Sequence, residues 1–337
     1  MKAKSFAYHG ALAPVDEACE LAASDILCIS DLMRTGSLID ALSRKLGIFL
    51  RHFRLGWVVF RNRRRDAILV RDFSNIPLLC IFPLIRWRKS RMLFVVNHNF
   101  QWTINGRTER AAFRWLGRWG CRFVFFEQVP VGPLQEYGID SSQCFALPHP
   151  TSETPFKRDR LGGVATVGIV GQFRPEKGVD DLLDVLLPVS SKYRVVLGLP
   201  NIGEFRRLSR HADGDWFELV DTVSDGGYRK TIMGCDALLL NHPPGGYEYR
   251  ASGLVADAAT AHVPVVACNL PMLRHQVSEP ARIGECFDDL SGIPQCIDRL
   301  SDRLANGEYD FETYNNARSA QALARQLDQI CNATPIL

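Results

Sequence analysis

Residues 167–178 read Val-Gly-Ile-Val-Gly-Gln-Phe-Arg-Pro-Glu-Lys-Gly, and this stretch decides the fold. Its first four residues predict a buried strand that ends at the glycine turn of Gly171, and residues 179–183 predict the helix that follows. Gly171 lets a ligand approach the backbone, while Arg174 and Lys177 carry cations toward the N–H groups of the next helix. This combination suits a diphosphate. A surface turn with solvated charges is the alternative, but the position between a buried strand and a helix favours binding.

Short apolar runs alternate with helical patterns along the rest of the chain, which is typical of an α/β protein with parallel sheets. We expect front-half strands at 25–29, 67–70, 93–97, 123–126 and 144–147, and back-half strands at 166–170, 194–198, 217–219, 237–240 and 265–267. We expect helices at 38–46, 51–65, 108–119, 131–137, 179–187, 204–212, 227–233 and 254–261, and a helical tail over 297–331. The pattern predicts two Rossmann-like, doubly wound domains that face a central cleft.

The net charge of +3 on 337 residues hides an uneven split. Residues 1–150 hold 21 Lys and Arg against 12 Asp and Glu, a balance of +9, and the remainder holds 19 against 25, a balance of −6. A basic front half predicts an anionic partner. The ten cysteines include no Cys-x-x-Cys pair, which favours buried thiols in a reducing compartment over a disulfide scaffold.

The start of the sequence lacks the apolar core of a signal peptide. The longest apolar stretch, residues 76–85, is far shorter than the ~20 residues that a membrane-spanning helix needs. We therefore expect a cytoplasmic protein without a transmembrane segment.

A second loop with ligand-binding character follows the strand expected at 237–240. It runs from His242 to Ser252 and is too rich in Pro and Gly for a regular element. Ser252 stands where a helix N-cap belongs, so free N–H groups at Ser252, Gly253 and Leu254 are expected to form a second anion site. Asp257 lies about one turn into that helix, where its carboxylate would hold ribose hydroxyls. A surface Asp favoured by the helix dipole is the alternative.

Three motifs in order resemble the GT-B glycosyltransferases: GIVGQFRPEKG at 168–178, DALLL at 236–240 and ASGLVADAATAHVPVVA at 251–267. The likeness is to the retaining, mannosyltransferase-like glycosyltransferase family 4, the "glycosyl transferases group 1". It covers roughly residues 67–270, and FVFFEQVPVGPLQEYGIDSSQCFALPHP at 123–150 joins it. The resemblance implies a GT-B fold with an acceptor-binding domain at 1–150, a linker at 151–163, a nucleotide-sugar domain at 164–300 and a helical tail at 301–337.

The resemblance also implies roles for single residues of the first loop. Lys177 matches the phosphate-binding lysine of the family. The family arginine that follows the strand glycine is Gln172 here, and Arg174 is the nearby candidate to replace its charge.

Further roles follow for the second loop and the front domain. Asp257 matches the second glutamate of the family's paired-glutamate motif, which holds the nucleotide ribose, while the first falls on Tyr249 with Glu248 beside it. His98 follows the strand expected to end at Asn97 and matches a histidine beside the reacting centre, so it is the expected catalytic residue. A hydrogen-bonded structural histidine is the alternative.

The front domain combines basic and aromatic residues. From Arg34 to Arg91 there are 14 Lys and Arg against three acidic residues, interleaved with Phe and Trp. Residues 51–65 predict a basic amphipathic helix, in which each basic residue is worth ~1 kcal/mol near anionic lipid. An anionic membrane surface is the expected partner and a solvated helix face is the alternative. Nucleic acid is not expected, because no nucleic-acid-binding motif accompanies the charge.

These observations predict a hexosyltransferase-type glycosyltransferase. It would move a sugar from a UDP- or GDP-linked donor to a glycan or lipid-linked acceptor in surface polysaccharide assembly, peripheral on the inner face of the membrane. Retention is implied by the resemblance. No metal or other cofactor is expected, because the cationic loops serve the phosphates, and Asp213-Gly214-Asp215 is interpreted as a turn. A non-catalytic nucleotide-sugar-binding homologue and a GT-B sugar-nucleotide epimerase are the alternatives.

Overall fold

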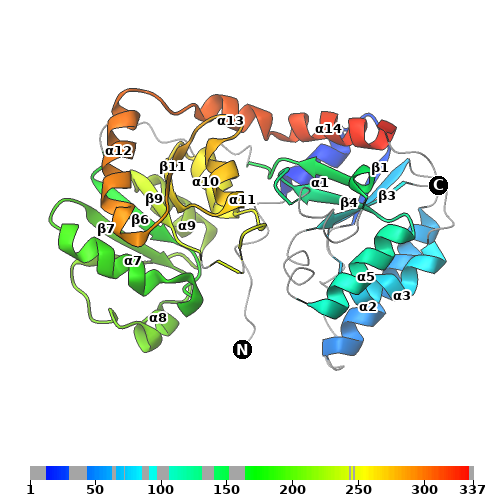
Figure 1. The fold of residues 1–337 in the computed structure, drawn as a ribbon, viewed down its shortest axis with the longest axis horizontal. Helices are drawn as coiled ribbons and strands as arrows, with labels where there is room; N and C mark the ends of the chain where they lie inside the picture. Colours follow the sequence, from blue (N-terminus) through cyan, green and yellow to red (C-terminus); the bar gives the residue numbers. More distant parts are fainter. Residues whose placement is uncertain are drawn as a thin grey trace. The chain divides into compact units, whose positions relative to one another are not determined.

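The computed structural model describes residues 13–29, 44–62, 66–71, 73–85, 91–96, 106–130, 140–151, 164–242, 244–245 and 247–333. The chain forms two compact units, each built around a parallel sheet (Figure 1). The front unit contains Val15–His149 and Ala320–Leu337, and the back unit contains Pro150–Ser319.

The front sheet has five parallel strands that lie side by side in chain order. They are β1 (Ile26–Ile29), β2 (Ala67–Val70), β3 (Arg91–Val96), β4 (Arg122–Phe126) and β5 (Cys144–Leu147). β2 and β4 are buried along their whole length, as is usual for parallel strands covered on both faces. Near-continuous apolar runs therefore form this sheet.

Five helices of the described residues accompany the front sheet: α1 (Ala13–Leu21), α2 (Arg44–Arg61), α3 (Asn75–Ile85), α5 (Arg107–Arg118) and α14 (Ala320–Ala333). α3 packs against both α2 and α5. The last helix, α14, packs on β5, and its Asp328 carboxylate accepts hydrogen bonds from the N–H groups of Ala23 and Ser24, both at 2.8 Å. The C-terminal helix thus completes the unit formed by the first half of the chain.

The back sheet has six parallel strands in the order β11-β10-β9-β6-β7-β8. They are β6 (Thr166–Val170), β7 (Arg194–Leu199), β8 (Phe217–Asp221), β9 (Ala237–Leu240), β10 (Val265–Cys268) and β11 (Gly284–Phe287). β6 and β9 are neighbours although two strands separate them in the chain, so strand order reverses between them. This is the doubly wound arrangement of a dinucleotide-binding fold.

Seven α-helices belong to the described part of the back unit: α7 (Val179–Leu186), α8 (Ile202–Leu208), α9 (Asp225–Met233), α10 (Gly253–Thr260), α11 (Pro271–Ser278), α12 (Ile293–Ala305) and α13 (Phe311–Ala317). Short 3-10 turns lie at Ser141–Gln143, Pro175–Lys177, Leu187–Val189 and Leu290–Gly292. α7 packs on α12, whereas α9 packs on β6, β7 and β8.

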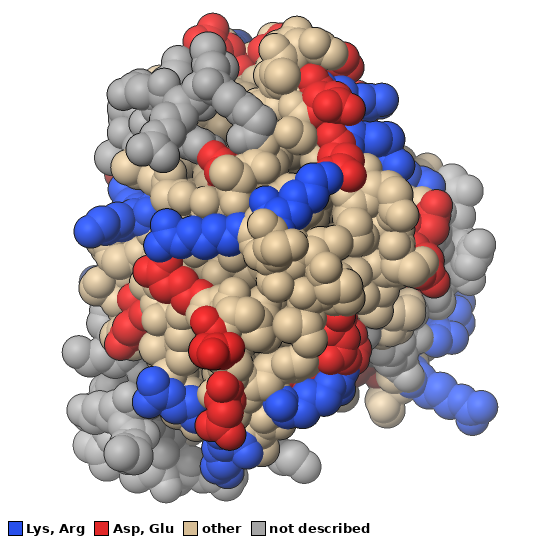
Figure 2. All heavy atoms as spheres, turned by 90° about the vertical axis from the view of Figure 1, so that its left-hand side faces the viewer, with Lys and Arg blue, Asp and Glu red and all other residues tan. Residues whose placement is uncertain are grey.

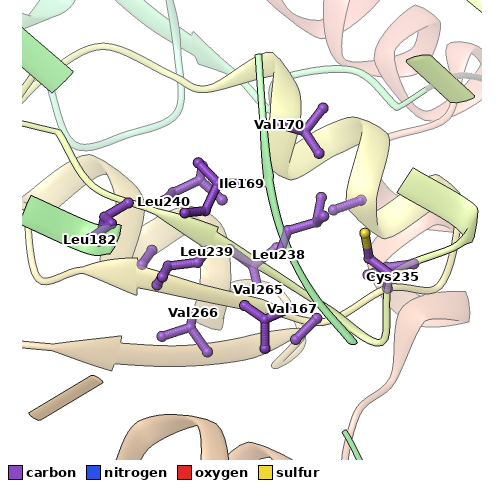
Figure 3. Packing of buried hydrophobic residues seen from close by; sticks show 14 of the residues in the cluster. Val167, Ile169, Val170, Leu182, Cys235, Leu238, Leu239, Leu240, Val265 and Val266 are labelled. Carbon is purple, nitrogen blue, oxygen red and sulfur yellow. The ribbon is translucent and has the colours of Figure 1, made fainter. Parts of the chain in front are cut away.

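The core of the back unit lies where its central strands meet. Val167 of β6, Leu238 of β9 and Val265 of β10 are fully buried and belong to one cluster (Figure 3). Each such side chain contributes about 1.5–3 kcal/mol by leaving water. Packing at Gly168 is so close that a Cβ there would lie 2.4 Å from the Cys235 sulfur. The central strands are therefore closely packed against one another.

The structure confirms the expected α/β fold class and all ten expected strands, with ends that differ by at most a few residues. Strand β11 was not expected, because Gly284-Glu285-Cys286-Phe287 offers too short an apolar pattern. Helix α3 was also missed, since it is apolar all round and contains Pro83. The helices expected at 38–46 and 51–65 fall on one helix, α2, as far as the described residues extend. The helix expected at 131–137 lies outside the described residues.

The expected tail over 297–331 consists of α12, α13 and α14. The expected domain boundaries at 150, 163 and 300 stay predictions. None of the nine cysteines whose side chains are described forms a disulfide. In the part of the chain that the structure describes, every helix is too short or too polar to cross a bilayer.

Candidate functional site

The strand reversal of the back sheet brings two loops together. One loop, Gly171–Gly178, leaves the carboxyl end of β6, and the other, Asn241–Ser252, leaves the carboxyl end of β9. A Cβ placed on Gly178 would lie 2.8 Å from the Asn241 amide nitrogen, so the two loops touch. Ligands of doubly wound sheets bind at such a switch point.

Backbone geometry shapes the first loop. Gly171 has a φ of 126°, and its N–H donates to the Gly198 carbonyl at 3.0 Å, which ties the end of β6 to β7. Gly178 has a φ of 62° at the start of α7. Both angles lie in the region that favours glycine, so the chain can turn twice within eight residues.

Asn201 holds this loop in place. Its side-chain oxygen accepts the Phe173 N–H at 2.8 Å, and its side-chain nitrogen donates to the Phe173 carbonyl at 2.9 Å. The Phe173 ring is buried against Phe205, with ring centroids 5.3 Å apart. Sequence reasoning missed Asn201, although its position just after β7, at the same edge of the sheet, was a usable signal.

Of the two cations expected in the first loop, Arg174 directly precedes the 3-10 turn Pro175–Lys177 and Lys177 is its last residue. The Arg174 guanidinium donates to the Gln172 side-chain oxygen at 2.9 Å. The family resemblance expects an arginine at position 172. Here Arg174 supplies a positive charge that contacts the Gln172 side chain. Lys177 is partly buried at the end of the turn.

Three stacked side chains dominate the second loop. The His242 and Tyr247 rings stack with centroids 4.4 Å apart, and the Arg250 guanidinium carbon lies 5.3 Å from the Tyr247 ring centroid. Burial, assisted by the positive charges of Lys177 and Arg250, lowers the pKa of His242 to about 3. His242 is therefore neutral at pH 7, and the positive charges that act on it come from both loops, Lys177 from the first and Arg250 from the second. The sequence analysis singled out neither His242 nor Arg250, although His242 closely follows β9.

Glu248 serves the second loop itself. Its carboxylate accepts the Gly245 N–H, and its carbonyl accepts the Met272 N–H of α11 at 3.1 Å. Tyr249 follows it and is partly buried. These bonds fix the conformation of the loop ahead of α10.

The expectation of a free N–H at Ser252 was wrong. Ser252 is the N-cap of α10, as expected, but its N–H donates to the side-chain oxygen of the fully buried Gln276 at 2.8 Å. The Gln276 nitrogen faces the Ser252 carbonyl at 3.4 Å. The Ser252 side chain makes no capping bond, so it does not occupy the first N–H groups of α10, those of Gly253 and Leu254. Gln276 could not be found from the sequence because α11 itself was not expected.

Asp257 projects from α10 toward α9. Its carboxylate accepts a hydrogen bond from the Tyr228 hydroxyl at 2.8 Å. Burial raises the pKa of Asp257 to about 6, and the Tyr228 bond opposes that rise. The carboxylate is thus close to its titration point near neutral pH and accepts hydrogen bonds when ionised. Tyr228 was not identified from the sequence.

The front unit offers a different arrangement at the ends of its strands. His98, the expected catalytic residue, lies outside the described residues. Glu127 follows β4 with a φ of 67°, an uncommon value for a residue other than glycine. Its buried carboxylate accepts the His149 N–H at 2.9 Å, just beyond β5. Sequence reasoning gave no sign of this contact.

The sequence matches no protein-family model and no curated protein. Solved structures match over most of the chain. Anabaena HepE in complex with UDP has a TM-score of 0.68 at 11% identity and covers 96% of each chain. A glycosyltransferase from Rickettsia africae has a TM-score of 0.61 at 12% identity, over 89% of this chain and 84% of its own. The lipopolysaccharide outer core galactosyltransferase WaaB has a TM-score of 0.56 at 12% identity, over 87% and 81%. This chain has the GT-B fold.

The GT-B fold accounts for two parallel sheets in one chain. At identities of 11 to 12%, the likeness extends to the fold and not to single residues. The roles of Gly171, Gln172, Arg174 and Lys177 in the first loop, and of Glu248 to Asp257 in the second, therefore depend on their own geometry.

Proposed function

We propose that this chain is a glycosyltransferase that binds a nucleotide-diphosphate-sugar at the carboxyl edge of its back sheet. The observation that carries the proposal is that Lys177 and Arg250, on two different loops at the β6–β9 switch point, both lie close enough to His242 for their charges to lower its pKa. Arg174 adds a third cation on the first loop. The same fold holds UDP in the HepE complex.

The diphosphate would lie between the two loops. Lys177, Arg174 and Arg250 would bind its oxygens by charge-assisted hydrogen bonds, which are about twice as strong as neutral ones. The first N–H groups of α10, at Gly253 and Leu254, would face the same anion. Gly171 would let the donor approach the backbone of the first loop.

Asp257 would accept hydrogen bonds from the ribose hydroxyls. Its contact with Tyr228 fixes the carboxylate, and its raised pKa makes the ionised form respond to pH near neutrality. Gln172 and Tyr249 lie at the two positions where the chain departs from the family motif, and we assign both to the surroundings of the donor.

Transfer breaks the bond between the anomeric carbon and a diphosphate oxygen and forms one between that carbon and an acceptor hydroxyl oxygen, whose proton passes to the leaving diphosphate. Negative charge then grows on the diphosphate while the sugar becomes oxocarbenium-like. Fixed cations and a helix N-terminus stabilise the leaving group, because they require no reorganisation during the reaction. We propose that these groups serve the reaction without a metal cofactor, that His98 acts on the acceptor or donor sugar, and that the anomeric configuration is retained, as in glycosyltransferase family 4.

The acceptor would be a glycan or a lipid-linked glycan of surface polysaccharide assembly, and the transferred sugar a hexose. The basic front half of the chain supports an anionic acceptor environment. WaaB, which shares the fold, is a lipopolysaccharide outer core galactosyltransferase. We propose that the protein works at the inner face of the membrane.

A non-catalytic nucleotide-sugar-binding role is the second candidate. The Glu248 carboxylate is engaged with the Gly245 N–H, and Gln172 and Tyr249 depart from the family motif. A site with fewer groups for the donor sugar would still bind the nucleotide.

Calorimetry with UDP and GDP followed by a donor-hydrolysis assay separates the two candidates. We expect one of the two nucleotides to bind and one of its hexose conjugates to be hydrolysed slowly, with and without a metal chelator. Membrane extract as acceptor should speed release of the nucleotide. Nucleotide binding without turnover of any donor would support the binding role instead. Failure of both nucleotides to bind would contradict the proposed site.

A further inference from the structure

One face of α2 carries an exposed apolar stripe beside arginines. We define the α2 face as Leu50, Phe53, Arg54, Trp57, Phe60 and Arg61. We propose that the α2 face docks the front unit on an anionic lipid bilayer, with its aromatic side chains among the headgroups and its arginines on the lipid phosphates. This inference is independent of the proposed transfer reaction, because it requires neither donor nor acceptor.

The apolar side chains of this face are exposed to an unusual degree. Trp57 is 60% exposed, Phe53 55%, Phe60 39% and Leu50 38%. Their spacing of three, four and three residues places all four on one side of the helix. Single exposed apolar residues are ordinary on protein surfaces, but a contiguous row of them marks an interaction site.

The opposite side of α2 is already used. Leu55 and Val59 are buried there, together with His52. The His52 ring bonds the Ile48 carbonyl through Nδ1 at 2.8 Å, and its Nε2 accepts the Ser74 N–H at 3.0 Å. Because these contacts fix the rotation of the helix, the α2 face cannot turn into the core of its own unit.

The charge of residues 41–65 indicates which kind of surface the α2 face binds. Between Asp40 and Asp66 the sequence has no Asp or Glu and eight Lys and Arg: Arg44, Lys45, Arg51, Arg54, Arg61, Arg63, Arg64 and Arg65. A basic segment that contains an amphipathic helix is attracted to anionic headgroups.

The arginines of the α2 face lie directly beside the aromatic rings. The Arg61 guanidinium carbon lies 6.0 Å from the Trp57 ring centroid, and the Trp57 and Phe60 rings stack at 5.9 Å. Tryptophan prefers the headgroup region of a bilayer, because its ring is apolar and its N–H is polar. Aromatic insertion and charge attraction therefore act at the same place.

A face of the back unit provides the contrast. The view in Figure 2 shows Lys and Arg interspersed with Asp and Glu. Ion pairs in this unit include Lys192 with Asp298 and Arg210 with Asp181. A surface of mixed sign has little attraction for an anionic bilayer, so α8 of this unit can supply a matched control.

Vesicle flotation of the full chain tests the proposal. The wild type should float with vesicles of phosphatidylcholine and phosphatidylglycerol, and high salt should weaken the binding. Phosphatidylcholine vesicles alone should bind it much less. The triple variant Phe53→Ser, Trp57→Ser, Phe60→Ser should lose about tenfold or more in partitioning, because it removes the three rings that would insert among the headgroups. The double variant Arg54→Gln, Arg61→Gln should lose several-fold and should lose part of the salt dependence.

The matched control removes an exposed apolar side chain and two exposed arginines from α8. Leu208→Ser with Arg206→Gln and Arg207→Gln should partition as the wild type does. Circular dichroism and UDP calorimetry on each variant check that it folds. Equal flotation of the triple variant and the wild type would overturn the proposal. So would equal binding to neutral vesicles, or tight binding to single-stranded RNA in place of vesicles.

Discussion

The back and front sheets of this chain differ in strand order, and the difference decides where their loops bring side chains together. In the back sheet, the reversal between β6 and β9 makes the loops Gly171–Gly178 and Asn241–Ser252 neighbours. In the front sheet, the five described strands follow one another in chain order. The reversal makes neighbours of two loops that are separated by two further strands in the sequence, and each loop carries a partly buried cation, Lys177 in one and Arg250 in the other.

The two units also differ in how they present charge. The back unit brings Lys177 and Arg250 to partly buried positions, where they and burial hold His242 neutral. The front unit presents Arg54 and Arg61 on the outside of α2 beside exposed aromatic rings. The first arrangement suits a small anion held in a fixed place, and the second suits an extended anionic surface.

Removal of Lys177 should give the largest of the expected effects, a loss of UDP affinity at the back unit. A charged hydrogen bond contributes about 1.5–3 kcal/mol, so Lys177→Ala should weaken UDP affinity by about 10- to 100-fold. Lys192→Ala is the matched control, because Lys192 precedes β7 at the opposite edge of the same sheet. Calorimetry with UDP measures both. Equal UDP affinities for the two variants would show that Lys177, at the switch point, does not bind the nucleotide.

Gln276 holds the end of the second loop through its hydrogen bond with the Ser252 N–H. Gln276→Leu should lower the free energy of unfolding by about 1–3 kcal/mol, because the Ser252 N–H loses its partner. Urea denaturation measures the change, and Gln295→Leu makes the same substitution on α12 at an exposed position, as a control. A loss no larger than that of the control would mean that the Gln276 contact does not hold the start of α10.

A comparison of Arg250 with Arg174 shows how much the second loop contributes to UDP affinity. We expect Arg250→Ala to weaken UDP affinity about tenfold, as the loss of one charged contact would. It should also raise the pKa of His242, since the Arg250 charge helps to lower it. Calorimetry and an NMR titration of the histidines test the two effects. If only Arg174→Ala weakened binding, the site would belong to the first loop alone.

Asp257 should give the smallest effect, seen as a dependence on pH. Its pKa in the folded protein, about 6, is above the ordinary 3.8, so the folded state holds the extra proton between these values. The free energy of unfolding should therefore fall as pH rises from about 4 to about 6. UDP affinity should rise several-fold across pH 6, because the ionised carboxylate is the better hydrogen-bond acceptor for ribose.

The variant Asp257→Asn isolates this titration from that of the nucleotide itself. Its affinity profile should lack the wild-type rise near pH 6, whereas Tyr228→Phe should move that rise to higher pH because Tyr228 helps to lower the pKa. Identical pH profiles for wild type and Asp257→Asn would separate Asp257 from the ligand.

The sequence predicted the elements whose signal is local. The β6 strand, the Gly171 turn and Lys177 lie in one short stretch, and Ser252 was correctly expected at an N-cap. It did not predict the contacts that depend on which strands are neighbours. Asn201, Tyr228 and Gln276 are ordinary polar residues in the chain, and their partners at Phe173, Asp257 and Ser252 lie 24 to 29 positions away. Strand order fixes such pairs, and a sequence pattern does not contain it.

A structure of the UDP complex would show directly whether the β6–β9 switch point binds the nucleotide. We expect the diphosphate between Gly171–Gly178 and the start of α10, with its oxygens within hydrogen-bond distance of Lys177 and Arg250 and the ribose on Asp257. A nucleotide bound at the amino edge of the back sheet, or on the front unit alone, would contradict it.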